Sequence, residues 1–356
     1  MKELNLQLFA NHVNVTGDTR TTGQAYPAYN DLSAEMKTFY DMTLIDEASA
    51  QLVHDQFGQK RPIPANGGKT IEFRKFSSLP KATEALTEGV TPDGKRLDVT
   101  AITATVSQYG DYITQSDVLE LTALDNTILE ATKLLGKQAG ATLDTIVRNV
   151  LVSNTNVTYC PTVSGSTETE VLSRSSLGTT AKLTVKTIQK VVAKLRGQNA
   201  PTINGKYVAI IHPYVAYDLM RDPEWIDAHK YAAPDNLYEG EIGEIAGVRF
   251  VQTTEAKVWN DSTCPVKTAA SDGNPAVYHS VFATLFIGEG AYGVTEITGG
   301  GLQTIIKQKG SAGTADPLDQ RSSVGWKALK TAELLIPNYL VRVESCSPDF
   351  DATPAN

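Results

Sequence analysis

The chain has 356 residues, enough for two or three domains, and its content of 41% hydrophobic and 20% charged residues is that of an ordinary soluble protein. A formal net charge of −8 argues against a surface that grips nucleic acid as a whole, because phosphate binding needs an excess of basic side chains. Cys160, Cys264 and Cys346 lie far apart without Cys-x-x-Cys spacing, so neither a disulfide framework nor a zinc site is indicated.

The first 65 residues predict an arm and surface helices. Residues 11–30 are rich in Thr, Gly and Asn and contain little that could form a core, so we expect an extended arm there. Residues 32–57 carry apolar side chains at helical spacing and predict one or two helices on the surface of the main body.

The next region predicts a long hairpin. Residues 70–74 and 97–106 alternate as strands do, and a change of phase at Ala101-Ile102 indicates a bulge. About twenty residues, 76–96, separate the two strands and include a turn at 91–94. Because a structureless loop of this length is uncommon inside a compact domain, we predict a hairpin that projects from the body and completes its packing on another molecule.

Positive and negative side chains alternate along this hairpin. These charged side chains could simply face solvent. We favour a second interpretation, in which they pair with oppositely charged groups of a neighbouring subunit. The hairpin provides six candidate residues for contact between subunits: Arg74, Lys75, Lys81, Glu88, Lys95 and Arg96.

Residues 116–153 form the longest helical pattern, with apolar residues at three- and four-residue steps. Asp117 with Glu120 and Thr127 with Glu130 are typical N-terminal capping pairs. They predict a short first helix and a main helix that begins at about Thr127. Gly136 and Gly140 each cost a helix about 1 kcal/mol relative to Ala, which predicts close packing on that side. The charged residues are expected to fall outside the apolar face: Glu130, Lys133, Lys137, Asp144 and Arg148.

After a Ser/Thr-rich linker at 154–180, the pattern predicts an inserted α/β domain. Thr184 can cap a helix that Gly197 ends. The later elements are a strand at 207–211, a helix from Pro213 to Met220, a strand at 248–252, a polar insertion at 259–275 and a long apolar strand at 277–287.

The C-terminal part returns to strand character at 302–309, 322–335 and 339–344, and we expect a loose tail at 345–356. The polar loop between the first two strands contributes three further candidate residues for contact between subunits: Asp316, Asp319 and Arg321. An acidic site is the alternative use of this loop, and an intersubunit salt bridge is favoured.

No pattern of catalytic residues is present. Residues 288–293 match G-x-G-x-x-G, but a dinucleotide site needs a helix after the glycines, and 294–297 continue as a strand. We therefore predict a flexible turn. The five histidines never pair at metal-ligand spacing, so we predict no catalytic, cofactor-binding or metal-binding residues, no cofactor and no enzymatic activity.

Three motifs, in this order, carry a resemblance to a known family: Leu-Thr-Glu-Gly-Val-Thr-Pro at 86–92, Tyr-Gly-Asp-Tyr-Ile at 109–113 and Asp-Pro-Leu-Asp-Gln-Arg-Ser-Ser-Val-Gly-Trp-Lys at 316–327. These motifs and the order of the predicted elements resemble those of the major capsid proteins of tailed bacteriophages, which have the Hong Kong 97-type fold. The resemblance covers nearly the whole chain. Within that family the motifs look like those of the coliphage N-four-like capsid group.

The resemblance implies an α+β fold in four parts. These are an N-terminal arm with surface helices at 1–65, an extended hairpin loop at 66–115, a peripheral domain with the long spine helix at 116–180 and 302–356, and an α/β axial domain at 181–301. It further implies a structural subunit that assembles into hexamers and pentamers of an icosahedral capsid.

The implied partners are other copies of the chain, a portal protein and packaged double-stranded DNA bound without sequence specificity, with room for a decoration protein and no membrane. A separate scaffolding protein is implied, because fewer than about 65 residues precede the hairpin and they show no long charged helix. The chain would reside in the virion, and in the bacterial cytoplasm during assembly of a phage or prophage. The alternatives are an encapsulin-like compartment shell protein and an α/β enzyme with an inserted hairpin.

Overall fold

A computed structural model describes residues 42–45, 47–48, 52–64, 68–76, 79, 81–86, 88–89, 91, 93–122, 127–165, 167–229, 243–269, 276–295, 301–311, 316–351 and 353–356. The predicted arm at 11–30 and most of the predicted helices at 32–57 lie outside these residues. The chain forms two compact units. The first comprises Met1–Gln51, Gln108–Thr142 and Gly300–Leu329, and the second comprises Leu52–Ser107, Leu143–Gly299 and Lys330–Asn356.

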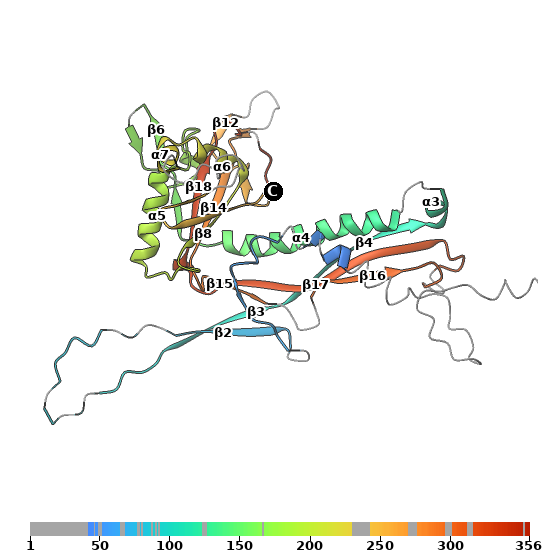
Figure 1. The fold of residues 1–356 in the computed structure, drawn as a ribbon, viewed down its shortest axis with the longest axis horizontal. Helices are drawn as coiled ribbons and strands as arrows, with labels where there is room; N and C mark the ends of the chain where they lie inside the picture. Colours follow the sequence, from blue (N-terminus) through green and yellow to red (C-terminus); the bar gives the residue numbers. More distant parts are fainter. Residues whose placement is uncertain are drawn as a thin grey trace, which may run out of the picture. The chain divides into compact units, whose positions relative to one another are not determined.

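The two predicted helices in the region 116–153 are confirmed. The short helix α3 spans Asp117–Thr122, and the long helix α4 spans Thr127–Val152 (Figure 1). In the first unit the α4 side chains Ala131, Leu135 and Ala139 are buried. Leu135 and Ala139 belong to the predicted apolar face, which is therefore confirmed over this part of the helix.

The close approach predicted at the helix glycines is present at Gly136. A Cβ atom at this position would lie 2.9 Å from the carbonyl oxygen of Leu44 and 3.0 Å from the Cβ of Glu47. We expect Gly136→Ala to lower the free energy of unfolding by about 1–2 kcal/mol, because overpacking against a backbone oxygen outweighs the gain of about 1 kcal/mol in helix propensity.

Urea unfolding of the two proteins measures this difference. Gly197→Ala is the matched control, because Gly197 is the last residue of helix α5 (Val185–Gly197) and no heavy atom lies within 4 Å of a Cβ placed there. A stabilised Gly136→Ala variant would show that the approach of Leu44 has no energetic consequence.

The first unit contributes three strands to a sheet of five. Strand β17 (Arg321–Leu334) pairs with β4 (Ser107–Ser116) and, antiparallel, with β16 (Gln303–Lys307). Side chains at even positions of β17, from 322 to 328, are buried, whereas Ser323 and Lys327 on the opposite face are half-buried. Among the described residues, one face of this sheet is therefore covered and the other is only partly covered.

The second unit is built on a larger sheet, shown near β14 and β18 in Figure 1. Its strands run in the order β5 (Val157–Tyr159), β18 (Leu340–Cys346), β14 (Val281–Ile287), β8 (Tyr207–Ile211), β10 (Val248–Gln252) and β9 (Glu244–Ile245), and β11 (Val258–Trp259) pairs with β14.

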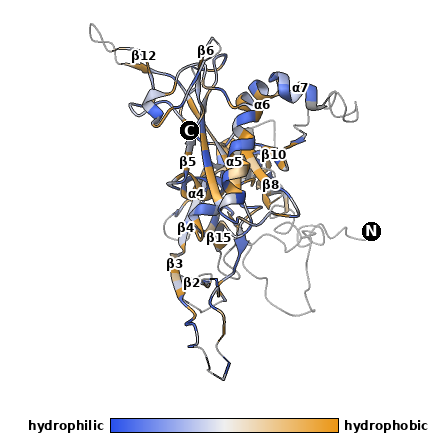
Figure 2. Cartoon of the chain, turned by 90° about the vertical axis from the view of Figure 1, so that its left-hand side faces the viewer, coloured by the Kyte–Doolittle hydropathy of each residue, from blue (hydrophilic) through white to orange (hydrophobic). Residues whose placement is uncertain are grey.

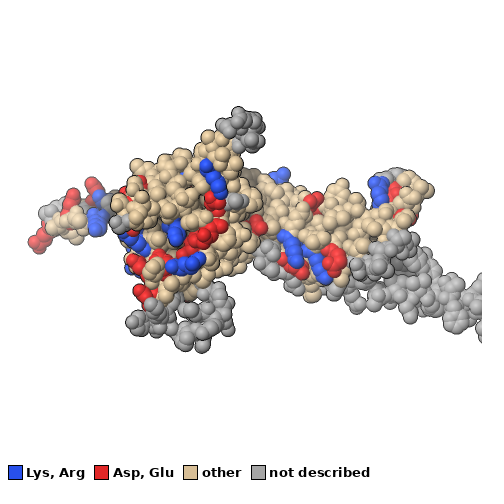
Figure 3. All heavy atoms as spheres, turned by 90° about the horizontal axis from the view of Figure 1, so that it is seen from above, with Lys and Arg blue, Asp and Glu red and all other residues tan. Residues whose placement is uncertain are grey.

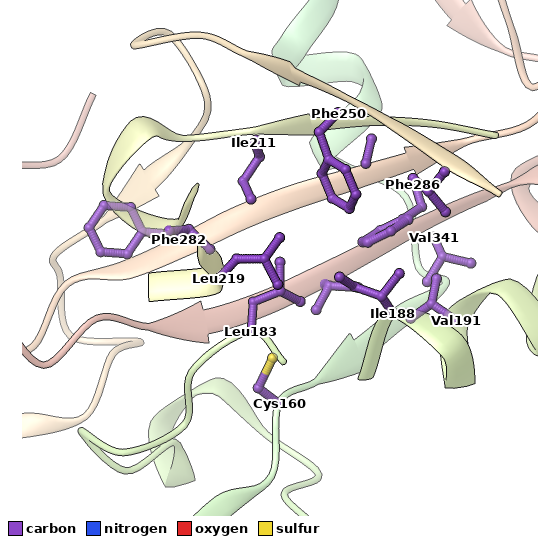
Figure 4. Close-up of a cluster of buried hydrophobic side chains, with 14 of the residues drawn as sticks. Cys160, Leu183, Ile188, Val191, Ile211, Leu219, Phe250, Phe282, Phe286 and Val341 are labelled. Carbon is purple, nitrogen blue, oxygen red and sulfur yellow. The ribbon is translucent and has the colours of Figure 1, made fainter. Parts of the chain in front are cut away.

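The parallel pair of β8 and β10 is joined through α6 (Pro213–Met220) and α7 (Pro223–His229), as an α/β segment requires. In Figure 2 β8 and β10 are coloured hydrophobic and α7 hydrophilic. The hydrophobic core of this unit gathers large apolar side chains from the sheet and from α5 (Figure 4). The members labelled in Figure 4 include Leu183, Ile188, Ile211, Leu219, Phe250, Phe282, Phe286 and Val341.

Helix α5 begins as predicted, since the side chain of Thr184 accepts a hydrogen bond from the backbone N–H of Thr187. The predicted strands at 207–211 and 248–252 and the predicted helix at Pro213 are also confirmed. These elements were recognisable because each has a local start signal and a regular apolar pattern.

Three segments were predicted wrongly. The expected linker at 154–180 contains β5 and a hairpin of β6 (Thr162–Ser164) and β7 (Thr167–Thr169). The apolar run at 277–287 forms two strands, because β13 (Val277–Tyr278) turns away to pair with β12 (Val266–Thr268) inside the expected polar insertion. These strands are only two or three residues long, which is too short for an alternating pattern to be recognised, and this is why the sequence did not reveal them.

The prediction of a loose C-terminal tail is also wrong. The ring of Phe350 stacks on that of Tyr214 with centroids 4.0 Å apart, and Ser280 Oγ donates to the carbonyl oxygen of Thr353 at 2.6 Å. The backbone N–H of Val258 donates to the Asn356 side chain at 2.9 Å. These contacts join residues distant in sequence, so no local pattern predicts them.

Asp351 anchors this tail and makes its packing dependent on pH. Its carboxylate accepts hydrogen bonds from Lys267 Nζ at 2.9 Å and contacts His279 Nδ1 at 3.0 Å, and these two contacts lower the pKa of Asp351 despite partial burial. The pKa of an Asp carboxyl in the unfolded chain is about 3.9. Because the pKa of Asp351 is lower in the folded state, the carboxylate stabilises the fold at pH values above about 3.9. This stabilisation is lost as the pH falls through the pKa of the folded state.

We therefore expect the backbone N–H of Ser280, which donates to the Asp351 carbonyl oxygen, to lose protection from hydrogen exchange below about pH 4. Hydrogen exchange by NMR between pH 3 and pH 6 measures this, after correction for the intrinsic exchange rate. In Asp351→Asn the protection should be low throughout and should no longer change with pH. An equal pH dependence in the variant would contradict the role of this carboxylate.

Strands β2 (Thr70–Phe76) and β3 (Val99–Thr105) form the predicted hairpin. Their register is continuous from the pair Thr70 and Thr105 to the pair Phe76 and Val99, so the predicted bulge at Ala101-Ile102 is wrong. The apolar pattern changes phase for another reason: Ile102 and Ala104 pack on their own chain, whereas Val99 lies on the opposite, exposed face.

Candidate assembly surfaces

The base of the hairpin is fixed to the second unit by a small apolar cluster. Phe73, Ala104 and Leu335 are buried together, and Ile71, Ile102 and Ile336 pack around them. Gly293 on strand β15 (Tyr292–Thr295) makes room for this cluster, since a Cβ there would lie 2.7 Å from the ring of Phe73. The direction in which the hairpin leaves its unit is therefore set by packing.

Beyond this base, the hairpin extends away from the rest of its unit (Figure 1). Several of its apolar side chains are exposed. The exposed fractions are 57% for Leu79, 78% for Leu86, 57% for Leu97 and 48% for Val99. Scattered single apolar residues are normal on a surface, but these four on one thin extension form a strip that none of the other described residues covers.

The charged residues predicted for the hairpin are exposed or half-buried, and acidic and basic groups are mixed along it (Figure 3). Arg74 Nε lies 3.4 Å from Glu72 and Arg96 Nε lies 3.7 Å from Asp98, in pairs too exposed to contribute much stability. Among the described residues none forms an ion pair with Lys75, Lys81, Glu88 or Lys95. Their role at an interface stays a prediction.

The loop that holds the other three candidate residues is tied together within the chain. Asp316 is 6% exposed, and its Oδ2 accepts the backbone N–H of Arg321 at 2.8 Å. The guanidinium of Arg321 lies 3.7 Å from the same oxygen, and the N–H of Asp319 donates to the Asp316 carbonyl oxygen at 3.1 Å. Asp316 thus orders the loop, while the side chains of Asp319 and Arg321 stay exposed.

Two of the sequence motifs, 109–113 and 316–327, meet in the first unit. A Cβ at Gly110 would lie 2.5 Å from the carbonyl oxygen of Trp326, and a Cβ at Gly325 would lie 2.7 Å from the Cβ of Tyr112. The glycines therefore allow β4 and β17 to approach closely. The sequence showed both motifs but not their contact, because the motifs are separated by about two hundred residues.

A hydrogen-bonded bridge joins these strands to α4. Gln138 Nε2 donates to Asp111 Oδ2 at 2.6 Å, and Trp326 Nε1 donates to Gln138 Oε1 at 3.3 Å. The bond from Gln138, together with the N–H of Tyr112, lowers the pKa of Asp111. This bridge holds the three elements in fixed register and leaves Tyr112 69% exposed.

A buried polar contact that the sequence did not reveal fixes residues 52–55 in the second unit. His54 Nδ1 lies 2.6 Å from Asp144 Oδ2, and both side chains are fully buried. Asp144 and Arg148 were expected outside the apolar face of the helix, which is wrong, since they are 0% and 2% exposed. A buried charge needs a tertiary partner, and only the fold supplies one.

Nothing in the described part of the chain indicates an enzyme site. Strand β15 includes the last two residues of the motif at 288–293 and continues to Thr295, which confirms the described part of the strand predicted at 294–297. Within the described ranges no three His, Cys, Asp or Glu side chains are grouped to hold a metal ion. No described helix is long and apolar enough to cross a membrane.

Comparisons with known proteins agree with this architecture. The structure is similar to the capsid of the Cyanophage P-SCSP1u (14% identity, 95% of this chain and 98% of that chain covered, TM-score 0.60). It is also similar to the capsid of Ralstonia phage GP4 (12% identity, 96% and 100% covered, TM-score 0.61) and to the head structure of Helicobacter pylori bacteriophage KHP40 (15% identity, 94% and 99% covered, TM-score 0.57). No curated protein sequence matches the chain.

These likenesses confirm the predicted α+β capsid fold of the Hong Kong 97 type, while the finer likeness to the coliphage N-four-like group stays a prediction. A model of the family described as phage capsid protein matches residues 101–310, which is more than half of the chain. The chain therefore belongs to the phage capsid protein family and is a structural capsid subunit rather than an enzyme.

Proposed function

We propose that this chain is the repeated subunit of an icosahedral phage shell, that it forms rings of five and six copies, and that the closed shell encloses double-stranded DNA. Contacts that join different surfaces of identical subunits generate rings, and a hairpin that docks on a neighbour is such a contact. The family membership supports the structural role, and the net charge of −8 is consistent with enclosing DNA without gripping it.

The observation that carries this proposal is the exposed apolar strip of the hairpin. Leu79, Leu86, Leu97 and Val99 stand on a thin extension whose base is held rigidly by Phe73 and Gly293. A rigid base lowers the entropy that docking must overcome, and the apolar side chains supply area to bury. The hairpin completes its packing on another copy.

Further parts of the proposal concern partners. A separate scaffolding protein directs the curvature of the shell, a portal protein occupies one vertex, and a decoration protein has room to bind on the outside. Assembly takes place in the bacterial cytoplasm and the product is the virion. The four-part division of the chain, with a hairpin at 66–115 and an axial domain at 181–301, belongs to the same proposal.

Negative-stain electron microscopy of the purified protein, alone and with its scaffolding protein, tests the proposed function. We expect shells, tubes or rings from the intact chain. Deletion of residues 77–96 should abolish these particles and leave a folded monomer, since the described residues of this segment are exposed. Circular dichroism and gel filtration establish that the deletion variant is folded. A uniform monomer or dimer from the intact chain under both conditions would overturn the proposal.

A further inference from the structure

A cleft of about 650 Å³ lies in the second unit, lined by strand β5, helix α5 and the segment 168–172. Its volume is within the range of about 300–1,000 Å³ that is usual for ligand-binding clefts. Of the apolar side chains in its lining, Leu172 is 88% exposed, and Val157 and Val171 are half-buried. The cleft therefore presents apolar surface that the described residues leave accessible.

Strand β5, which lines this cleft, has a free edge. It is the outer strand of the larger sheet and pairs on one side only, with β18. The backbone groups of residues 156 and 160 bond to β18 at 3.0 Å, so those of Val157 and Tyr159 between them face the other way. The N–H of Val157 bonds within the preceding turn. None of the described residues bonds to the carbonyl oxygen of Val157 or to the N–H and carbonyl oxygen of Tyr159.

An uncovered strand edge is a template for a further strand, and proteins usually protect such edges. Extended peptides bind to edges of this kind as an added strand, with backbone hydrogen bonds that supply affinity and side-chain contacts that supply specificity. Because β5 has three residues, the added strand would be short. The free backbone groups and the adjoining cleft together form a site for an extended segment.

The charges in the cleft indicate what this segment carries. Helix α5 contributes three lysines at four-residue steps: Lys186, Lys190 and Lys194. The chain itself pairs the first two, with Glu168 and Glu170, each at 2.5 Å. Within the described ranges no carboxylate forms an ion pair with Lys194, whose Nζ donates to the hydroxyl of Thr158 at 3.3 Å.

Lys194 is the lysine for which a partner charge matters most. Its side chain is half-buried, and burial together with the nearby charge of Lys190 lowers its pKa. A charged group that is partly removed from water is stabilised by an opposite charge at close range. An occupant with a carboxylate near Lys194 would supply that charge, so the cleft favours an acidic segment.

The occupant must combine this carboxylate with apolar side chains. The exposed segment 97–99 of this chain has such a pattern, Leu-Asp-Val, but it is already engaged in the hairpin. Val99 pairs with Phe76, and Asp98 lies 3.7 Å from Arg96. The cleft therefore fits a segment of a different protein.

We propose that the cleft between strand β5 and helix α5 binds an extended segment of a different protein, which adds as a strand to the free edge of β5 and places a carboxylate against Lys194. This inference goes beyond the proposed function, because it does not concern contacts between copies of the chain. In a shell subunit, such a site would attach a second protein species to every copy.

A library of random seven-residue peptides, presented by mRNA display and selected on the purified full-length chain, tests the chemistry of the occupant. We expect the selected peptides to carry Asp or Glu between apolar residues that favour strands. Lys194→Glu should bind these peptides roughly tenfold more weakly, because like charges then face each other. It should bind peptides whose acidic residue is replaced by Lys more tightly than the wild type does.

Lys206→Glu is the matched control for this charge change. Lys206 is an exposed lysine of the same unit, paired with Glu244 and outside the lining of the cleft. Its reversal should leave the affinity for the selected peptides within about threefold of wild type. Circular dichroism establishes that both variants are folded.

Methylation of the peptide backbone tests strand addition without altering the protein. Alternate N–H groups of an extended peptide face opposite edges, so one set faces β5 and the other does not. Methylating one set should weaken binding roughly tenfold, and methylating the other set should leave it within about threefold. Fluorescence anisotropy of the labelled peptides measures both. Equal losses from the two sets would contradict strand addition.

The outcomes separate this inference from the proposed function. If no selected peptide distinguishes the wild type from Lys194→Glu, the inference is overturned and the shell function stands. Binding to the free chain but not to assembled particles would show that a second copy covers the cleft, and this would also overturn it. Absence of particles from the intact chain would overturn the proposed function, while peptide binding to the free chain would still be measured.

Discussion

Replacing Asp144 by Ala is expected to lower the free energy of unfolding of the second unit by about 3–5 kcal/mol, because the substitution leaves several buried donors without an acceptor. Asp144 Oδ1 accepts the backbone N–H groups of Val53 and His54 at 2.9 and 2.7 Å, and Oδ2 contacts His54 Nδ1 at 2.6 Å. The hydroxyl of Tyr292 donates to the His54 carbonyl oxygen, so the contact extends to strand β15.

Urea unfolding followed by tryptophan fluorescence measures this loss, since Trp225 and Trp259 belong to the second unit. Asp144→Asn should lose less than Asp144→Ala, because its amide oxygen can still accept the backbone N–H groups. Lys190→Ala is the matched control in the same unit. It removes an exposed pair with Glu170 at 2.5 Å and should cost much less than Asp144→Ala, because exposed ion pairs contribute little to stability. A loss below about 1 kcal/mol for Asp144→Ala would contradict the structural role of this contact.

The sequence predicted the elements whose signals are local. Thr127 followed by Glu130 marked the start of α4, and Thr184 marked the start of α5, because a capping residue and a periodic apolar face lie within a few residues of each other. Strand β17, predicted at 322–335 from its strand character, is observed at Arg321–Leu334. A signal of this length is difficult to confuse with another element.

Buried charged residues could not be predicted in this way. Asp144 and Arg148 look like residues of a solvated helix face until residues 52–55 and 255 are placed against them. Arg148 Nη1 donates to the carbonyl oxygen of Glu255 at 2.8 Å, a partner 107 residues away. Desolvation disfavours the charged form of Arg148 and lowers its pKa, and the nearby carboxylates of Glu255 and Asp144 counter this in part.

The hairpin shows a different reason for a wrong prediction. The phase change at Ala101-Ile102 looked like a bulge because a regular strand that buries one face keeps its apolar residues in one phase. Ile102 packs on its own chain, but Leu97 and Val99 are exposed in the isolated chain. In a chain that assembles, an apolar pattern reports the surfaces buried in the assembly as well as those buried in the fold.

The C-terminal tail was predicted wrongly because single side chains in a short polar segment do not show where they will pack. Residues 345–356 carry no long apolar face, yet Phe350 stacks on Tyr214 and Asp351 contacts both Lys267 and His279. Each of these contacts joins a single side chain to a surface formed by remote segments. Such a surface exists only once the larger sheet has formed.

Replacing Glu344 by Gln should also destabilise the second unit, by about 2–4 kcal/mol, because it leaves two partly buried guanidinium groups without their buried counter-charge. Glu344 is fully buried on β18. Arg174 Nε and Nη2 donate to its two oxygens, each at 2.7 Å, and Arg342 Nε lies 2.9 Å from Oε1. The guanidinium of Arg174 also lies over the ring of Trp259, with its central carbon 3.7 Å from the ring centroid.

The same substitution made together with Arg174→Met should recover at least half of this loss. Burying a charge costs most when its partner is missing, and removing both partners removes that cost. Denaturant unfolding of the wild type, the two single variants and the double variant forms a double-mutant cycle that measures the coupling. Strongly coupled losses would show that the energy lies in the pairing of the charges. If the losses of the two single variants simply add in the double variant, the pairing would carry no energy. Each side chain would then contribute by packing alone, and Arg174 would do so through its contact with Trp259.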